Sequence, residues 1–292
     1  MTAGSRRLFA VASGAVVAAV GLVGCADATP VAPSAAPPAA SERAETSLGA
    51  LEHVHEVAFQ GGELLLASHQ GVYAVDLDSG ALELVGGVRF DAMGMAVTDA
   101  GVLASGHPGA QVDDVFLAPN VGLISLEGGD WTSVSLGGEV DFHALSASAD
   151  GVSVAGLASG EMTVLTSADG GETWQRGAQL DARDLTLTPD GLVATTADGL
   201  MRSDDGGATF AAVEGAPLLV LVAADGSALV GVDAAGAVVR SGAEGWQTLG
   251  RVEGTAAAVA VADDGMLAVV DDRGLVISGD DGQSWQVLLP AA

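Results

Sequence analysis

Short apolar stretches separated by glycine-containing turns follow one another along the chain from residue 53 onwards. Residues 185–187 and 192–195 flank a turn at Gly191, and residues 257–261 and 266–270 flank a turn at Gly265. Apolar runs of this length, bounded by turn residues, are typical of β-strands. The pattern favours many short strands joined by tight turns over long helices.

A second pattern repeats within these strands, at a period of roughly 40 residues, which is typical of propellers and solenoids. The segment Ser-x-Asp-x-Gly-x-Thr/Ser-aromatic occurs in three near-complete copies, and eroded copies end in Trp131 and Trp246. The residues of the three copies are Ser167, Asp169, Gly171 and Trp174, then Ser203, Asp205, Gly207 and Phe210, then Ser278, Asp280, Gly282 and Trp285.

This segment resembles the Asp box, or BNR repeat, of sialidases and related propellers, in which it is a structural turn. Its polar side chains are expected to bond to backbone N–H groups, and its aromatic residue to pack between blades. The units run at about 53–87, 88–136, 139–179, 181–215, 216–252 and 254–289. We therefore predict an all-β fold, a β-propeller of six blades, with seven the alternative if a strand from 46–52 completes another sheet.

The first fifty residues have the composition of an export signal followed by a tether. Arg6 and Arg7 precede an apolar run at 8–23 that is too short to span a membrane, and Cys25 follows this run. Residues 22–25 resemble the bacterial lipobox, which implies cleavage before Cys25 and a lipid on its sulfur. We predict a signal peptide at 1–24, a lipidated cysteine and Pro/Ala-rich tether at 25–50, and one propeller domain at 51–292. The protein would be exported, by the general or the twin-arginine route, and anchored to the outer face of the cell membrane.

Charge and cysteine content narrow the choice of partners. The chain has 38 acidic and 10 basic residues and a formal charge of −28, which argues against nucleic-acid binding and favours cations. Its single cysteine excludes an intramolecular disulfide and a cysteine-rich metal site. The sequence gives no sign of oligomerisation, so we expect a monomer.

All five histidines fall in the first three units. They start inner strands (His53, His55, His143) or follow second strands (His69, His107), and Met93 and Arg183 occupy the place of His143 in units two and four. Such positions open on one face of a propeller, so the histidines should rim one mouth of the central channel, away from the Asp-box turns. Imidazole is a common metal ligand; with Met93 it would suit copper, and with carboxylate it would suit zinc.

Several segments around these histidines occur in an order that resembles a known family. They are residues 53–55, 67–73, 91–95, 104–108 and 141–143, followed by Asp boxes. The chain is similar to bacterial surface lipoproteins catalogued as BNR-repeat or F510-type glycosylhydrolases. Glu56 departs from the small residue expected there and would narrow the channel mouth.

The family label does not settle the activity, because the Asp box marks a fold and fold does not establish function. A sialidase needs a tyrosine nucleophile and an arginine cluster, and the only tyrosine, Tyr73, lies inside a predicted strand. Other glycosidases need only two carboxylates, for which Asp91 and Asp141 are the candidates, with Asp181 and Asp184 near the same mouth. The tryptophans belong to the Asp boxes, which leaves none as a sugar platform.

Three functional hypotheses follow. The first is a non-catalytic binding module that takes a metal ion, small ligand or partner protein at the histidine-rimmed mouth. The second is a glycoside hydrolase acting on an extracellular carbohydrate, or glycan, through carboxylates at that mouth. The third, by analogy with Asp-box propellers that help build photosystem II, is an assembly factor for a membrane complex.

Overall fold

The computed structural model describes residues 47–109 and 116–292. The predicted signal peptide, Cys25 and the tether up to residue 46 lie outside the described residues. Within the described part, no helix has the length and apolar character needed to cross a membrane.

The described strands form six four-stranded antiparallel sheets, each from one contiguous stretch of chain. The first two are β1 (Val54–Gln60), β2 (Glu63–Ser68), β3 (Gly71–Val75) and β4 (Leu82–Leu84), then β5 (Asp91–Val97), β6 (Val102–His107), β7 (Leu123–Glu127) and β8 (Asp130–Ser135). The next two are β9 (Phe142–Ala147), β10 (Val154–Ala158), β11 (Thr163–Ser167) and β12 (Gln175–Gln179), then β13 (Ala182–Thr188), β14 (Gly191–Thr196), β15 (Gly199–Ser203) and β16 (Ala211–Ala212). The last two are β17 (Leu219–Asp225), β18 (Ala228–Asp233), β19 (Ala237–Gly242) and β20 (Gly245–Arg251), then β21 (Ala258–Val261), β22 (Leu267–Asp271), β23 (Gly274–Ser278) and β24 (Gln286–Pro290).

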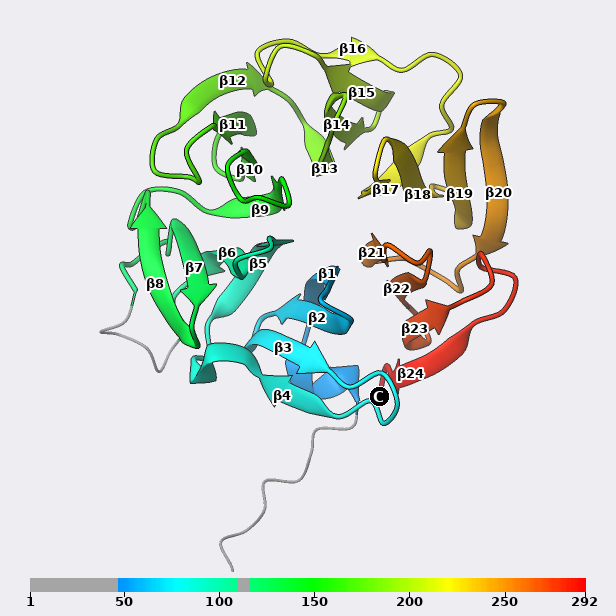
Figure 1. Cartoon of the computed structure of the whole chain (residues 1–292), viewed down its shortest axis with the longest axis horizontal. Helices are drawn as coiled ribbons and strands as arrows, with labels where there is room; N and C mark the ends of the chain where they lie inside the picture. The colour runs from blue at the N-terminus through cyan, green and yellow to red at the C-terminus, as the bar shows by residue number, and fades with distance from the viewer. Residues whose placement is uncertain (1–46, 110–115) are drawn as a thin grey trace, which may run out of the picture. The chain divides into compact units, whose positions relative to one another are not determined.

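The six sheets are the blades of a closed β-propeller. The first strands of successive blades contact one another in the order β1, β5, β9, β13, β17 and β21, and β21 contacts β1. These strands therefore surround the central axis (Figure 1). The predicted six-blade, all-β fold is confirmed. The seven-blade alternative is wrong, because residues 48–51 form the 3-10 helix η1 (Leu48–Leu51) instead of a strand.

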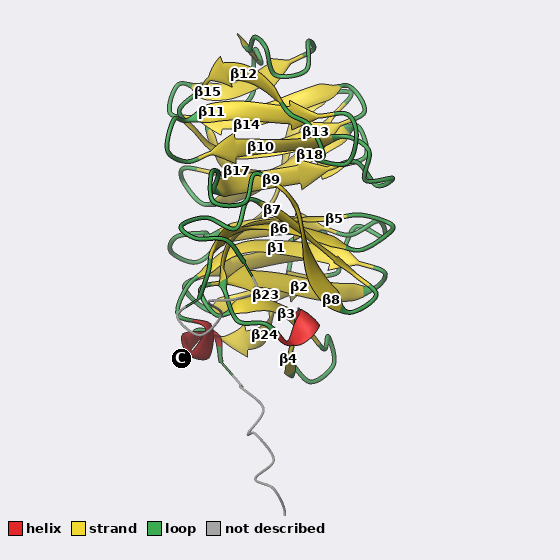
Figure 2. Cartoon of the chain, turned by 90° about the vertical axis from the view of Figure 1, so that its left-hand side faces the viewer, coloured by secondary structure: helices red, strands yellow, loops and turns green. Residues whose placement is uncertain are grey.

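Strands of one blade bury both faces, because every blade packs between two others. In β2, Leu64 and Leu66 belong to the core shared with the last blade, whereas Leu65 and Ala67 belong to the core shared with the second blade. Successive side chains of a strand point to opposite faces. This explains why the sequence shows continuous apolar runs where a half-exposed sheet would show alternation. Strands and loops make up nearly all of the described chain, with η1 and η2 (Val85–Gly87) the two short helical turns (Figure 2).

Within the described residues, no strand is exchanged across the seam between the first and last blades, and packed side chains close it. Leu48 and Leu51 of η1 pack there with Leu275 and Leu289 of the last blade. Leu48 is only 8% exposed. Among the described residues, Leu48 is therefore part of this core.

The three near-complete repeat segments form turns with the same hydrogen bonds. In the first, the Ser167 hydroxyl donates to Asp169 Oδ1 at 2.7 Å and accepts from the Gly171 N–H at 2.8 Å. Asp169 Oδ1 also accepts from the Thr173 N–H at 2.9 Å. Equivalent bonds join the residues of the other two turns, which are Ser203, Asp205, Gly207 and Thr209, and Ser278, Asp280, Gly282 and Ser284.

Glycine is required in these turns because they press against the preceding blade. Gly171 has a φ of +88°, and a Cβ there would lie 2.1 Å from Leu123 Cδ2. The aromatic residue that ends the same turn adds to this contact, since Trp174 Nε1 donates to Ser135 Oγ of the preceding blade at 2.9 Å. Phe210 and Trp285 pack against neighbouring-blade cores in the same way.

The turn aspartates should give the fold a distinct acid sensitivity. Hydrogen bonds from Thr173 and its equivalents lower the pKa of Asp169, Asp205 and Asp280 from 3.8 to about 2. A carboxylate whose pKa is depressed by folding stabilises the native state above its unfolded pKa, and this contribution is lost as pH falls through the folded value. Replacing all three by Asn should therefore flatten the fall in melting temperature between about pH 4 and pH 2. Glu172→Gln, which removes a carboxylate outside this hydrogen-bond network, should leave that slope unchanged; an equal effect would contradict the assignment.

Candidate functional site

A β-bulge interrupts the inner strand of each of the first five blades. The ladder to the second strand skips one residue near the start of β1, β5, β9, β13 and β17. A bulge re-aims the side chain of its extra residue and occurs often beside functional sites. The skipped residues are His55, Met93, His143, Arg183 and Val220. The first four line one cavity at the mouth of the channel.

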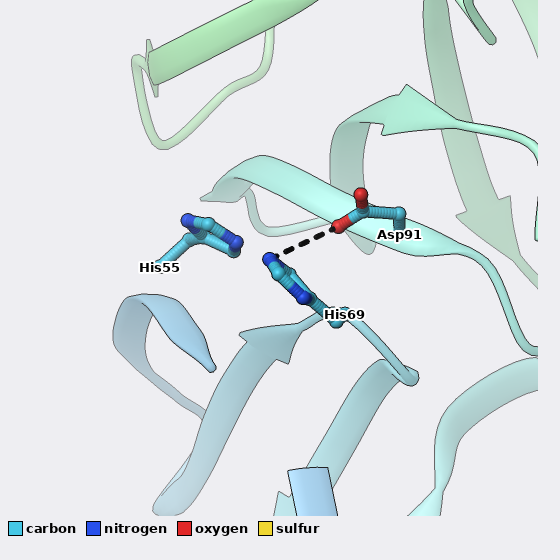
Figure 3. A group of neighbouring side chains, drawn as sticks. All are labelled: His55, His69 and Asp91. Atoms are coloured by element: carbon cyan, nitrogen blue, oxygen red, sulfur yellow. Dashed lines mark ion pairs between the residues drawn. The ribbon is translucent and has the colours of Figure 1, made fainter. Parts of the chain in front are cut away.

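His55, His69 and Asp91 form the first of two groups of candidate ligands (Figure 3). They come from β1, from the turn after β2 and from the start of β5, and one ligand atom of each lies within 4.8 Å of the other two. The rings of His55 and His69 stack with centroids 4.8 Å apart, and His69 Nε2 lies 3.9 Å from Asp91 Oδ1. Two blades therefore supply ligands from three chain segments to one point.

Two polar atoms of this first group are buried without a hydrogen-bond partner among the described residues. They are His55 Nε2 and Asp91 Oδ1. Burial lowers the pKa of His55 to about 4, helped by His53, His69 and His143 nearby. His55 is therefore neutral at pH 7, with a ring nitrogen lone pair available to a ligand.

His53 contacts the first group but is not one of its three candidate ligands. Its ring lies 4.7 Å from that of His55, edge to face, and 5.7 Å from that of His69. On the outer side, Glu52 Oε2 lies 3.7 Å from His69 Nδ1. A carboxylate behind a ligating imidazole orients the ring and raises its basicity.

His107, Asp141 and His143 form the second group, from the second and third blades. Asp141 Oδ2 lies 2.7 Å from His143 Nε2 and 3.3 Å from His107 Nε2, and it accepts a hydrogen bond from Ser159 Oγ at 3.0 Å. The other oxygen, Asp141 Oδ1, is buried and has no hydrogen-bond partner in the described chain. Asp141 is only 6% exposed, so its charge depends on these partners.

The neighbours of Asp141 in the second group favour the charged form of its carboxylate. Burial acts to raise the pKa of Asp141, but His143, His107 and Ser159 together bring it below its ordinary value. In turn, the hydrogen bond and charge of Asp141 raise the pKa of His143. The pair can thus hold a proton between them, and that proton would be released to solvent if a metal ion bound there.

The mouth cavity has a volume of about 270 Å³ and joins the histidine side of the channel to the fourth blade. His55, Met93, His143 and Arg183 all line it. The sequence prediction that the histidines gather at one mouth agrees with this placement. His53, His55 and His143 line the cavity, His69 stacks on His55, and His107 shares Asp141 with His143.

Two carboxyl groups, the half-buried Glu56 and the buried Asp184, line this cavity. Glu56 and Asp184 line both the mouth cavity and a second cavity of about 190 Å³ further along the channel. Burial raises the pKa of Glu56 well above its usual value, and it raises the pKa of Asp184 to about 6. Glu56, which was expected to narrow the mouth, lines the mouth cavity and also the second cavity.

The candidate catalytic carboxylates are split between the two groups. Asp91 belongs to the first group and Asp141 to the second, each beside imidazoles. Of the other two carboxylates considered, Asp184 lines the mouth cavity and Asp181 lies beside a pocket between the fourth and fifth blades. Histidine is the only aromatic residue among the described residues that line the mouth cavity.

The β-bulges that help to bring these two groups together across blades were not predicted from the sequence. The bulges have no sequence signature in this chain, because a bulge depends on how two strands pair. Ser159 and Ser105 were also missed; Ser159 bonds Asp141, and Ser105 Oγ accepts the Phe142 N–H at 3.0 Å. Ser105 lies within β6 and Ser159 directly follows β10, and neither has a sequence pattern that would have identified it.

Gly106 of β6 allows the backbone of this strand to approach Asp91 at the start of β5. It has a φ of +147°, and a Cβ at this position would lie 1.9 Å from the Asp91 carbonyl oxygen. Gly106→Ala is therefore expected to destabilise the fold by about 1–3 kcal/mol, the usual cost of a strained backbone position. Urea unfolding would measure it. Gly62→Ala is the control, because Gly62 also has a positive φ but a Cβ there would meet no other atom. This substitution should lower the free energy of unfolding by less than Gly106→Ala. Equal losses would show that the close approach of Gly106 to Asp91 is unimportant.

Comparison with known proteins supports the fold and leaves the family open. No family model matches the chain, and no curated protein matches it by sequence. A structure titled as a nidogen/laminin complex aligns with a TM-score of 0.55 at 14% identity, over 74% of this chain and 88% of that one. A GH74 enzyme from Niastella koreensis aligns with a TM-score of 0.55 at 19% identity, over 80% of this chain. A GH74 xyloglucanase from Xanthomonas campestris aligns with a TM-score of 0.50 at 18% identity, again over 80%.

The present chain spans 37% of each of these two GH74 chains. At such identities the likeness shows a shared propeller fold and nothing about activity. The resemblance to bacterial surface lipoproteins with BNR repeats stays a prediction.

Proposed function

We propose that this protein is a non-catalytic binding module that holds a divalent transition-metal ion, zinc or copper, at the histidine-rich mouth of its propeller. The observation that carries the proposal is the first group. His55, His69 and Asp91 bring three ligand atoms within 4.8 Å, and two buried polar atoms there have no hydrogen-bond partner in the described chain. Leaving buried polar atoms unpaired is costly, and a bound ion would remove that cost.

The spacing of the first group requires only a small adjustment to hold an ion. Zinc binds imidazole nitrogen and carboxylate oxygen at about 2.0–2.2 Å, which puts two tetrahedral ligand atoms about 3.4 Å apart. His69 Nε2 and Asp91 Oδ1 are 3.9 Å apart. Because the His69 side chain is 37% exposed, rotation of that side chain can close this difference.

The second group differs because its carboxylate already bonds both imidazoles. An interpretation without metal is that Asp141 simply orients His107 and His143. The buried and unpartnered Asp141 Oδ1 favours the metal interpretation here too. Histidine with carboxylate suits zinc, and a thioether such as Met93 in the same cavity would favour copper.

Metal titration of matched variants tests the proposal. We would titrate zinc and copper into the full chain, without a polyhistidine tag and with Cys25→Ser to remove the thiol. Stoichiometric binding is expected, with a stabilisation of about 2.7 kcal/mol at a free metal concentration 100 times the Kd. The double variant His55→Ala/His143→Ala, which breaks both groups, should lose binding and stabilisation.

His53→Ala is the matched control, because His53 lies beside the first group and outside both sets of ligands. It should bind metal like the parent chain. Absence of binding in the parent, or equal binding in the double variant, would overturn the proposal. Met93→Leu separates the two metals, since only copper affinity should fall if the thioether is a ligand.

A second candidate function, glycoside hydrolysis, is favoured by one observation. Glu56, whose pKa burial holds well above its usual value, lines the mouth cavity together with His143, and His143 Nε2 lies 2.7 Å from the charged Asp141. Paired carboxyl groups with separated pKa values are the usual acid and base of such reactions. Activity on a panel of aryl glycosides that is lost in Glu56→Gln and insensitive to chelators would support this reading over metal binding. No turnover of any substrate would remove it.

We also propose that the propeller is exported and lipid-anchored through Cys25 at the outer face of the cell membrane. The support is the sequence at residues 1–25 alone. In a bacterial host, Cys25→Ser is expected to abolish incorporation of labelled palmitate, because the sulfur is the acceptor. Unchanged labelling of the variant would contradict the assignment.

A further inference from the structure

Arg183 lines the mouth cavity together with His55 and His143, one histidine from each group. It is the bulged residue of β13, in the place that His55 and His143 occupy in their own blades. Its Nη2 donates to the Ala256 carbonyl at 3.3 Å, the one hydrogen bond that its guanidinium makes within the described chain. A guanidinium has five N–H donors, so donors remain for a ligand in the cavity.

The neighbouring carboxylate does not neutralise Arg183 through a contact. Asp184 Oδ1 accepts the Leu185 N–H and its Oδ2 accepts the Val222 N–H, both at 2.8 Å. These bonds direct both oxygens to the backbone. No ion pair between Arg183 and an acidic side chain occurs within residues 47–109 and 116–292.

The two groups of candidate ligands each place one histidine, His55 or His143, on the wall of the same cavity. Each offers three protein ligands, and a three-ligand zinc site keeps its fourth position for water or another molecule. The cavity of about 270 Å³ far exceeds the roughly 30 Å³ that one water occupies in the liquid. The cavity therefore has room for a small molecule beside His55, His143 and Arg183.

We propose that this cavity binds a small oxyanion, of carboxylate or phosphate type, together with the metal ion. One oxygen would take the open coordination position and another would pair with the guanidinium of Arg183. This inference rests on the metal-binding function proposed above. A chain with a formal charge of −28 repels anions overall, so the metal ion and Arg183 must together supply the local positive charge. Binding of the oxyanion should therefore require the metal.

The experiment titrates inorganic phosphate and, separately, acetate into the full Cys25→Ser chain loaded with one equivalent of Co²⁺. The visible absorption of Co²⁺ reports a change in its ligands. We expect a saturable change with at least one of the two anions, and the responding anion identifies the source. In Arg183→Gln the affinity should fall by about 10- to 100-fold, the loss of a charge-assisted hydrogen bond, while affinity for Co²⁺ without oxyanion stays unchanged.

Two further variants keep the test decisive. Arg183→Lys retains the charge without the planar fork and should give an intermediate affinity. Arg176→Gln, which removes an exposed arginine on the outer strand of the third blade, should bind oxyanion like the parent. Circular dichroism of each variant confirms that the propeller is folded before titration.

The outcomes separate this inference from the function on which it rests. If the parent chain binds no Co²⁺, zinc or copper, the metal-binding function fails and this inference fails with it. If metal binds but neither anion changes the spectrum, or if Arg183→Gln binds the anion as tightly as the parent, only the oxyanion inference is overturned. Anion binding that is equally tight in the metal-free chain would also overturn it.

Discussion

Asp141→Asn is expected to weaken zinc binding at the second group by about 100-fold, the upper end of the cost of losing even an outer-shell partner. The substitution preserves the size of the side chain and an oxygen that can accept the Ser159 hydrogen bond. It removes the negative charge that lies 2.7 Å from His143 Nε2 and 3.3 Å from His107 Nε2. Competition of the protein with a chelating dye measures the affinity, in a His55→Ala background so that only the second group can bind.

Asp150→Asn provides the control for this prediction. Asp150 is an exposed turn residue of the same blade that accepts hydrogen bonds from Ser148 Oγ and the Val152 N–H. Its replacement should leave zinc affinity unchanged. If Asp141→Asn binds zinc as tightly as its background, Asp141 serves only to orient the two imidazoles, and the second group is not a metal site.

Phe142→Ala is expected to lower the free energy of unfolding by about 3–5 kcal/mol, the usual cost of removing a fully buried phenylalanine ring. The ring is 0% exposed, lies 4.9 Å from the ring of Trp174, and fills the space over Gly156, where a Cβ would lie 2.4 Å from it. Guanidinium unfolding in the presence of a chelator measures the loss. A domain of this kind is typically stable by about 5–15 kcal/mol, so the effect is a large part of the total.

The same substitution should weaken metal binding, because Phe142 lies between Asp141 and His143 in the chain and anchors the start of β9. Phe142→Leu fills most of the space and should cost about 1.5 kcal/mol or less. Leu117→Ala removes a side chain that is 62% exposed and should change stability by no more than about 0.5 kcal/mol. A small effect of Phe142→Ala would show that the blades repack around the cavity.

The fold could be predicted from the sequence because the strands and turns of each blade follow one another along the chain, and this pattern repeats from blade to blade. Each blade is one contiguous segment, so strand runs and turn residues near Gly191 or Gly265 needed no long-range information to interpret. The repeat then fixed the number of blades, except at the N-terminal edge. There the apolar residues Leu48 and Leu51 form a helical turn that packs into the seam, and their pattern alone could not distinguish this from an additional strand.

The sequence also predicted on which face the histidines lie, because antiparallel strands alternate in direction and their ends are set by counting residues. It could not predict which side chains meet. The pairing of His69 with Asp91, and of His107 with Asp141, joins different blades, and such distances depend on how the sheets pack around the axis. The tertiary structure alone decided the bulges at His55, His143 and Arg183, since a bulge is a property of two paired strands. The same bulges turn Arg183, which the sequence marked only by position, toward the cavity where the metal ligands gather.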